Sequence, residues 1–120
     1  MGFLDFLGAV VDGVAAGVAA VNSMSIESKK NNYLKNVTGD ELSIIDLSAQ
    51  SISNDIDNDR KDDTAQFFRE IYVKFENKAL TIDSNDSENY NEDFENALIK
   101  SLIIIEKAFR LSGKNLREND

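Results

Sequence analysis

Alternating aspartates at Asp55, Asp57 and Asp59 have the spacing in this sequence that is closest to a metal site. Carboxylates at every second position are typical of a calcium-binding loop. Such a loop also needs glycine at its sixth position, for a sharp turn, and glutamate at its twelfth. The chain has Arg60 and Gln66 at those positions. The stretch therefore resembles a calcium loop only in its first five residues, and we predict a solvated acidic loop instead.

A second acidic stretch begins at Asp83 and fails at the same two positions. Counted from Asp83, the sixth residue is Glu88 and the twelfth is Phe94. Glutamate cannot replace the glycine of the turn, and phenylalanine offers no oxygen to a cation. We therefore predict two acidic loops without a specific metal ion, and no cofactor.

Other kinds of catalysis have little support in the composition. The sequence contains no cysteine and no histidine, which removes thiol nucleophiles, disulfides and the commonest general base. The remaining acids and bases are carboxylates, lysines and three tyrosines, Tyr33, Tyr72 and Tyr90. No spacing favours one pair of them, and there is no phosphate-binding glycine loop or nucleophile elbow. We predict that the protein is not an enzyme.

The net charge of −9 is carried entirely by one part of the chain. Residues 1–38 hold three acids and three bases, whereas residues 39–120 hold 19 acids and 10 bases. Such a surface repels the phosphates of nucleic acids and of anionic lipids. We therefore do not expect nucleic acid as a ligand, and a protein partner or self-association is favoured. A small-molecule substrate is not expected either.

The least polar stretch, Gly2 to Val21, is predicted to form a helix with one wide apolar side and one slim acidic side. Two aspartates, Asp5 and Asp12, interrupt it and make its membrane affinity sensitive to pH. Small residues four apart favour close packing of helices. The predicted membrane or oligomer interface consists of Phe3, Leu4, Phe6, Leu7, Val10, Val11, Gly13, Val14, Gly17, Val18 and Val21.

The setting of residues 2–21 stays open between a membrane, an oligomer and the protein's own core. Nine large apolar residues favour insertion by roughly 3–5 kcal/mol, and Asp12 near the centre opposes it by about 3 kcal/mol. The segment is therefore expected to bind a bilayer reversibly and not to insert stably across it. Lys29, Lys30 and Lys35 lie close enough in sequence to contact headgroups.

Three further helices are predicted from periodicity and capping residues. The first begins at Thr38, which forms a capping box with Glu41, and carries an apolar seam. A charged loop is predicted from Asn54 to Asp63, and Asp62 or Asp63 is expected to cap the helix after it. That helix carries the aromatic stripe, and a second loop follows at 81–91. The last helix runs from Glu92 to Ser112, between an Asn91 cap and Gly113. The predicted seam is Leu42, Ile45, Ala49, Ile52 and Ile56, and the aromatic stripe is Phe67, Phe68, Ile71, Tyr72, Phe75, Ala79 and Leu80.

The fold class that follows is all-α, a small helical bundle of three to four helices with an apolar Gly/Ala-rich N-terminal helix. We divide it into an N-terminal helix or arm at 1–36, with the first helix running on towards Tyr33 or Asn36, and an acidic body at 37–120. The first function hypothesis is a non-enzymatic interaction protein whose N-terminal helix mediates membrane association or self-assembly. The alternative is a soluble acidic adaptor of the immunity-protein, antitoxin or secretion-chaperone type that binds a basic protein. The expected location is the cytoplasm, with or without peripheral contact to a membrane.

Overall fold

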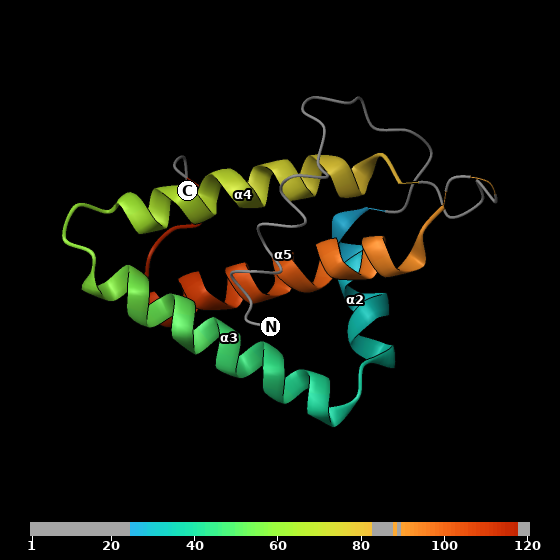
Figure 1. Ribbon diagram of the computed structural model, residues 1–120, viewed down its shortest axis with the longest axis horizontal. Coiled ribbons are helices and arrows are strands. Elements are labelled where there is room, and N and C mark those ends of the chain that lie inside the picture. The colour runs from blue at the N-terminus through green and yellow to red at the C-terminus, as the bar shows by residue number, and fades with distance from the viewer. Residues whose placement is uncertain (1–24, 83–87, 89, 118–120) are drawn as a thin grey trace.

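The computed structural model describes residues 25–82, 88 and 90–117, and this part of the chain is all-helical. Its helices are α2 (Ile26–Asn36), α3 (Gly39–Asn58), α4 (Asp63–Leu80) and α5 (Glu92–Ser112), packed against each other as a small bundle (Figure 1). The predicted all-α bundle is confirmed. The predicted helix at residues 2–21 lies outside the described residues.

Helix α5 is the central element of the bundle. It lies between α3 and α4, and α2 packs across its N-terminal half at one end (Figure 1). Most of its circumference is buried, because apolar residues occur in an almost unbroken run through its middle. Its buried residues are Leu98, Ile99, Ser101, Leu102, Ile103, Ile104, Ile105, Ala108 and Phe109.

Both ends of α5 are formed as the sequence predicts. The Asn91 side chain accepts a hydrogen bond from the Phe94 backbone N–H at 3.0 Å. At the other end, Gly113 adopts the left-handed conformation, with φ of 68°. The Gly113 N–H donates to the Arg110 carbonyl and the Lys114 N–H donates to the Phe109 carbonyl, at 3.2 and 3.1 Å. This pair of bonds is the Schellman motif, which satisfies carbonyls that the helix end would leave free.

Gly113→Ala is expected to lower the free energy of unfolding by about 1–2 kcal/mol, because an L-residue is strained at this positive φ. Gly39→Ala is the control, since Gly39 is the first residue of α3 and a Cβ there meets nothing within 4 Å. This control should be neutral or stabilise by about 0.4–1 kcal/mol. Urea denaturation of both variants measures the difference, and equal losses would contradict the conformational explanation.

Helix α3 begins as predicted and contributes most of its predicted seam. The Thr38 side chain accepts from the Glu41 N–H at 3.2 Å. The residues of the seam from Ile45 onward, Ile45, Ala49, Ile52 and Ile56, are buried. The prediction for Leu42 is wrong, because its side chain is 42 % exposed. Leu42 lies in the first turn of α3, beyond the region where the bundle covers that face.

The predicted loop from Asn54 to Asp63 is wrong in its first half, because α3 continues to Asn58. Ile56 is fully buried, and its burial draws this polar stretch into the helix against its weak intrinsic propensity. The predicted cap is also different. Asp62 precedes α4 in a left-handed conformation and makes no side-chain cap bond, whereas the Asp59 carboxylate accepts from the Thr64 N–H and hydroxyl, both at 2.7 Å.

Helix α4 confirms the aromatic stripe with one exception. Phe68, Ile71, Tyr72, Phe75 and Ala79 are buried, and Leu80 is partly buried against the core. Phe67 was predicted within the stripe, yet its side chain is 52 % exposed. Adjacent residues of a helix point about 100° apart, and Phe67 lies on the side of Phe68 where the other helices do not cover α4.

Helix α2 ends at Asn36, within the predicted range, but does not continue from the preceding residues. Ser25 has an extended backbone, with ψ of 157°, and its side chain accepts from the Ser28 N–H at 3.2 Å. A serine in this conformation is a helix N-cap. The predicted run-on of a single helix through Ser25 is therefore wrong.

Candidate functional site

Two features of the described bundle combine polar chemistry with a defined place in the fold. The first is a pair of buried lysines on α2, and the second is an open acidic hollow at the turn between α3 and α4. The first is enclosed and satisfied by its own fold, whereas the second faces solvent. Only the feature that faces solvent can bind a ligand or a partner without a change in the fold.

Lys29 is 7 % exposed and joins α2 to the ends of both α4 and α5. Its ammonium donates to the Ala79 carbonyl at 2.9 Å, to the Ile82 carbonyl at 3.1 Å and to Glu95 Oε2 at 2.7 Å. The three donors of the ammonium are thus all used. Two of the acceptors lie at the C-terminal end of α4, where free carbonyls favour a cation.

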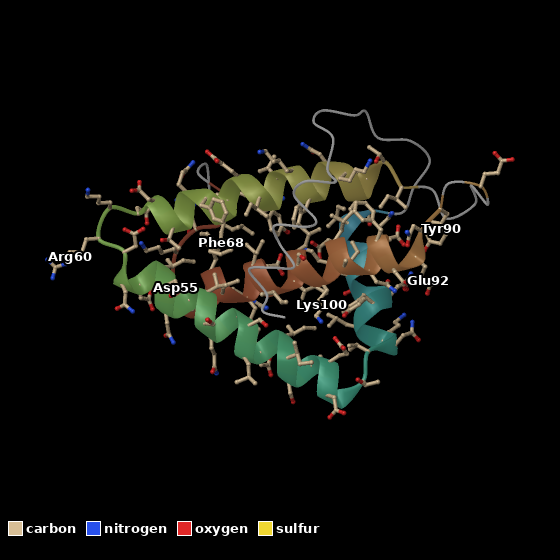
Figure 2. All side chains as sticks on the ribbon, in the orientation of Figure 1. Asp55, Arg60, Phe68, Tyr90, Glu92 and Lys100 are labelled. Carbon is tan, nitrogen blue, oxygen red and sulfur yellow. The ribbon has the colours of Figure 1, made fainter. Side chains whose placement is uncertain are left out.

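Glu95 is shared between this lysine and a tyrosine. The Tyr90 hydroxyl donates to Glu95 Oε1 at 3.0 Å. Burial and this hydrogen bond raise the pKa of Tyr90 to about 12. Tyr90 and Glu92 lie at the end of the bundle opposite to the α3–α4 turn, which carries Arg60 (Figure 2).

Lys30 is 4 % exposed and makes a second polar link. It donates to the Tyr72 hydroxyl at 2.7 Å and to Glu106 Oε2 at 2.8 Å, and its ammonium lies 5.3 Å from the centre of the Tyr72 ring. It also reaches Glu27 Oε1 at 3.4 Å. The link therefore joins α2 to the middle of α4 and to the C-terminal half of α5.

The pKa values of Lys30 and Tyr72 favour a charged lysine and a neutral phenol. Burial lowers the pKa of Lys30, but its hydrogen bonds to Glu106 and Tyr72 and their charges outweigh burial and raise it above its ordinary value. Burial also raises the pKa of Tyr72, although the bond from Lys30 opposes this. At neutral pH Lys30 is therefore charged and the Tyr72 phenol is neutral.

Stability should fall at alkaline pH for this reason. Both folded pKa values are raised, so the stabilisation is complete below about pH 10, where the unfolded groups begin to titrate, and is lost above it. Chemical denaturation at a series of pH values from 7 to 12 measures the loss. Tyr72→Phe removes the phenol and should give a shallower decline. An identical pH profile for the variant would contradict this account.

The buried lysines correct one expectation from the sequence. Lys29 and Lys30 were expected to be available to lipid headgroups, but both are enclosed and paired within the fold. Lys35, in the last turn of α2, is exposed. The sequence offered one indication, since both lysines follow the apolar Ile26 at helical spacings of three and four.

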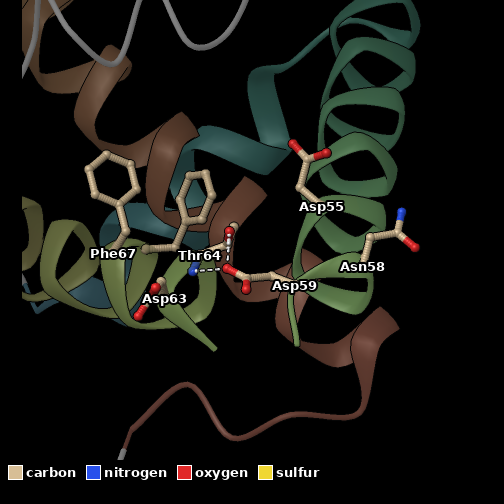
Figure 3. Close-up of a pocket in the computed structure, with 7 residues that line it drawn as sticks. Asp55, Asn58, Asp59, Asp63, Thr64 and Phe67 are labelled. Carbon is tan, nitrogen blue, oxygen red and sulfur yellow. Dashed lines mark hydrogen bonds between the residues drawn. The ribbon is translucent and has the colours of Figure 1, made fainter. Parts of the chain in front are cut away.

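The acidic hollow lies between the last turns of α3 and the first turns of α4, and its volume is about 620 Å³ (Figure 3). Asp55 and Asn58 border it from α3, and Phe67 borders it from α4. Asp59 is engaged by Thr64 and by the Lys61 N–H, and these bonds lower its pKa. The lining residues are Asp55, Asn58, Asp59, Asp63, Thr64, Phe67 and Phe68.

Two carboxylates of the hollow are available to a ligand. Asp55 and Asp63 are exposed, and neither forms a hydrogen bond or ion pair with any residue that the structure describes. Phe67 presents an exposed ring on the α4 side of the hollow, across from Asp55 (Figure 3), in edge-to-face contact with Phe68 at 5.3 Å between centroids. Carboxylates next to an aromatic face suit an organic cation such as a guanidinium.

The aspartates whose spacing resembles a calcium loop lie along a helix and at its end. Asp55 and Asp57 lie on α3 and Asp59 ends it, so the three carboxylates are not arranged around a loop. Within the described ranges, no three acidic side chains converge as a metal site. The sequence indicates the acidic residues of the hollow, but it does not indicate that the Phe67 ring lines the hollow as well.

The predicted interface residues between Phe3 and Val21, and the acids Asp5 and Asp12, lie outside the described residues. None of the helices that the structure describes is both long and apolar enough to cross a membrane. Comparison with protein-family models, with curated proteins and with solved structures gives no match to this chain.

Proposed function

We propose that this protein is a non-enzymatic acidic adaptor in the cytoplasm that binds a basic protein partner. The observation that carries the proposal is the hollow at the α3–α4 turn, where Asp55 and Asp63 accompany the exposed ring of Phe67. A partner arginine or lysine would bind there, with its charge between the carboxylates and its flat or aliphatic part against the ring. Immunity proteins, antitoxins and secretion chaperones are adaptors of this kind.

The distribution of charge supports the same proposal. All thirteen lysines and arginines of the chain lie in the described part, and seven of them form ion pairs within the fold. These cations already have carboxylate partners within the fold, whereas Asp55 and Asp63 have no partner among the described residues. Complementary charge steers a basic partner towards this end of the bundle and makes the association sensitive to salt. The seven are Lys29, Lys30, Arg69, Lys100, Lys107, Lys114 and Arg117.

An NMR titration with a short arginine-rich peptide tests the proposal on the full chain. At low salt, the perturbed backbone amides should cluster at residues 55–68. Asp55→Asn/Asp63→Asn should weaken binding on the order of tenfold, because both charges beside the ring are lost. The effect should diminish in 0.5 M salt, since exposed charges are screened.

The matched control is Asp57→Asn/Glu70→Gln. It changes the net charge by the same amount, and both residues are exposed and outside the lining of the hollow. This variant should bind the peptide nearly as well as the original protein. Equal weakening in both variants, or perturbations spread over the whole surface, would contradict a specific site.

A second candidate function rests on the sequence of residues 2–21. Their Gly/Ala/Val-rich pattern, interrupted by Asp5 and Asp12, favours membrane association or self-assembly. Liposome flotation of the full chain and of a chain beginning at Ser23, at neutral and acidic pH, tests the membrane form. Equal partition of both proteins at both pH values would contradict it. Sedimentation of the same two proteins tests self-assembly.

A further inference from the structure

We propose that α2 is a strap that opens as a unit while α3, α4 and α5 stay folded. The proposal rests on how α2 is attached. Its buried residues are Ile26, Lys29 and Lys30, and Tyr33 is partly buried against the core. Leu34, its remaining large apolar residue, is 41 % exposed. Ile26 is the single buried apolar residue that α2 adds to the described core, whereas α3, α4 and α5 contribute the other 18.

The attachment of α2 is therefore mainly polar. Lys29 links it to the end of α4 and to Glu95, and Lys30 links it to Tyr72 and Glu106. Charge-assisted hydrogen bonds hold two surfaces well, but the net stabilisation is limited because both charges lose hydration when they are buried. Burial of a shared apolar core has no such opposing cost. The free energy needed to detach α2 should be lower than that for unfolding of the core.

The size and boundaries of α2 also allow it to open separately. It has 11 residues, bounded by an extended Ser25 on one side and an extended Val37 on the other. An isolated helix of this length is marginal in water, so a detached α2 would lose its helical hydrogen bonds. The core of the other three helices would keep its own buried contacts, which run from Ile45 to Phe109. Local opening at lower free energy than global unfolding is common in such arrangements.

Opening would change the surface that the protein presents. Glu95 is now 15 % exposed and pairs with Lys29, and Glu106 pairs with Lys30. Detachment of α2 would uncover both carboxylates and the Tyr72 hydroxyl on α4 and α5. The closed strap thus neutralises a face that would otherwise add to the acidic surface.

Native-state hydrogen exchange of the full chain at pH 7, followed by mass spectrometry, tests the proposal. Amides at residues 30–36 should exchange roughly a hundredfold faster than amides at 98–108 in α5. Glu106→Ala removes the carboxylate partner of Lys30. It should raise exchange in α2 on the order of tenfold and leave the α5 amides nearly unchanged.

Asp46→Ala is the matched control. Asp46 accepts from Lys107 between α3 and α5, as Glu106 accepts from Lys30, and the two carboxylates are 52 % and 38 % exposed. This control should leave exchange in α2 unchanged. If Glu106→Ala does not fold, Tyr72→Phe removes a single hydroxyl from the same link and should raise exchange in α2 alone. Equal protection of α2 and α5, or a rise by the same factor in both, would overturn the proposal.

Discussion

Replacing Phe75 with alanine is expected to lower the free energy of unfolding by about 3–5 kcal/mol. The Phe75 side chain is fully buried in the core that α4 shares with α5. Its truncation removes a large apolar surface from the core and leaves a cavity that the helices around it can only partly fill. The loss is a large fraction of the stability of a domain of this size, so it should be measured by urea denaturation at low temperature.

Phe67→Ala is the matched control for this substitution. Phe67 is on the same helix and is also a phenylalanine, but its side chain is 52 % exposed. We expect a change within about 1 kcal/mol, because little apolar area is removed from the interior. The comparison separates burial from helix propensity, since alanine replaces phenylalanine in α4 in both variants. Similar losses in the two variants would contradict the assignment of Phe75 to the core and Phe67 to the surface.

The sequence predicts those parts of the fold that local chemistry determines. The bounds of α5 follow from Asn91 and Gly113, whose side chain and backbone freedom act within a few residues of the helix ends. The buried faces of α4 and α5 follow from apolar residues at helical spacing. These elements could be placed without knowledge of their neighbours.

The errors arise where another element decides the outcome. The stretch after Asn54 is rich in Asn and Asp, yet Ile56 extends α3 through it because the bundle supplies a core at that point. Leu42 fits the same periodicity but lies beyond the cover of its neighbours. Local propensity is weak compared with burial, so tertiary contacts override it in both directions.

The candidate sites show the same limit. The carboxylates of the hollow could be identified from composition, but not the exposed ring of Phe67 beside them, which depends on how α4 is rotated. The sequence alone predicts that the lysines of α2 are solvated, because their hydrogen-bond acceptors lie far along the chain. Ala79 and Glu95 are 50 and 66 residues away from Lys29.

Lys29→Met is expected to lower the free energy of unfolding by about 3–5 kcal/mol, the usual cost of removing one partner of a buried ion pair. Methionine keeps most of the apolar stem but leaves Glu95 without its cation and removes the lysine donor from the Ala79 and Ile82 carbonyls. Urea denaturation measures the loss. Lys35→Met is the control, because Lys35 is exposed in the last turn of the same helix, and it should change stability by about 0.5 kcal/mol or less.

A double variant distinguishes the cost of an unpaired charge from the worth of the pair. Lys29→Met/Glu95→Leu removes both charges, and apolar replacements of a whole buried pair are often neutral in stability. The double variant should therefore be more stable than Lys29→Met alone, although the carbonyls at the end of α4 still lack the bonds from Lys29. If Glu95→Leu instead lowers the stability of Lys29→Met further, the ion pair contributes net stabilisation. Glu95 would then also stabilise the fold through its hydrogen bond from Tyr90. If the double variant recovers stability, the loss in Lys29→Met comes mainly from the unpaired Glu95 carboxylate. The ion pair would then specify where α2 docks and contribute little to how strongly it is held.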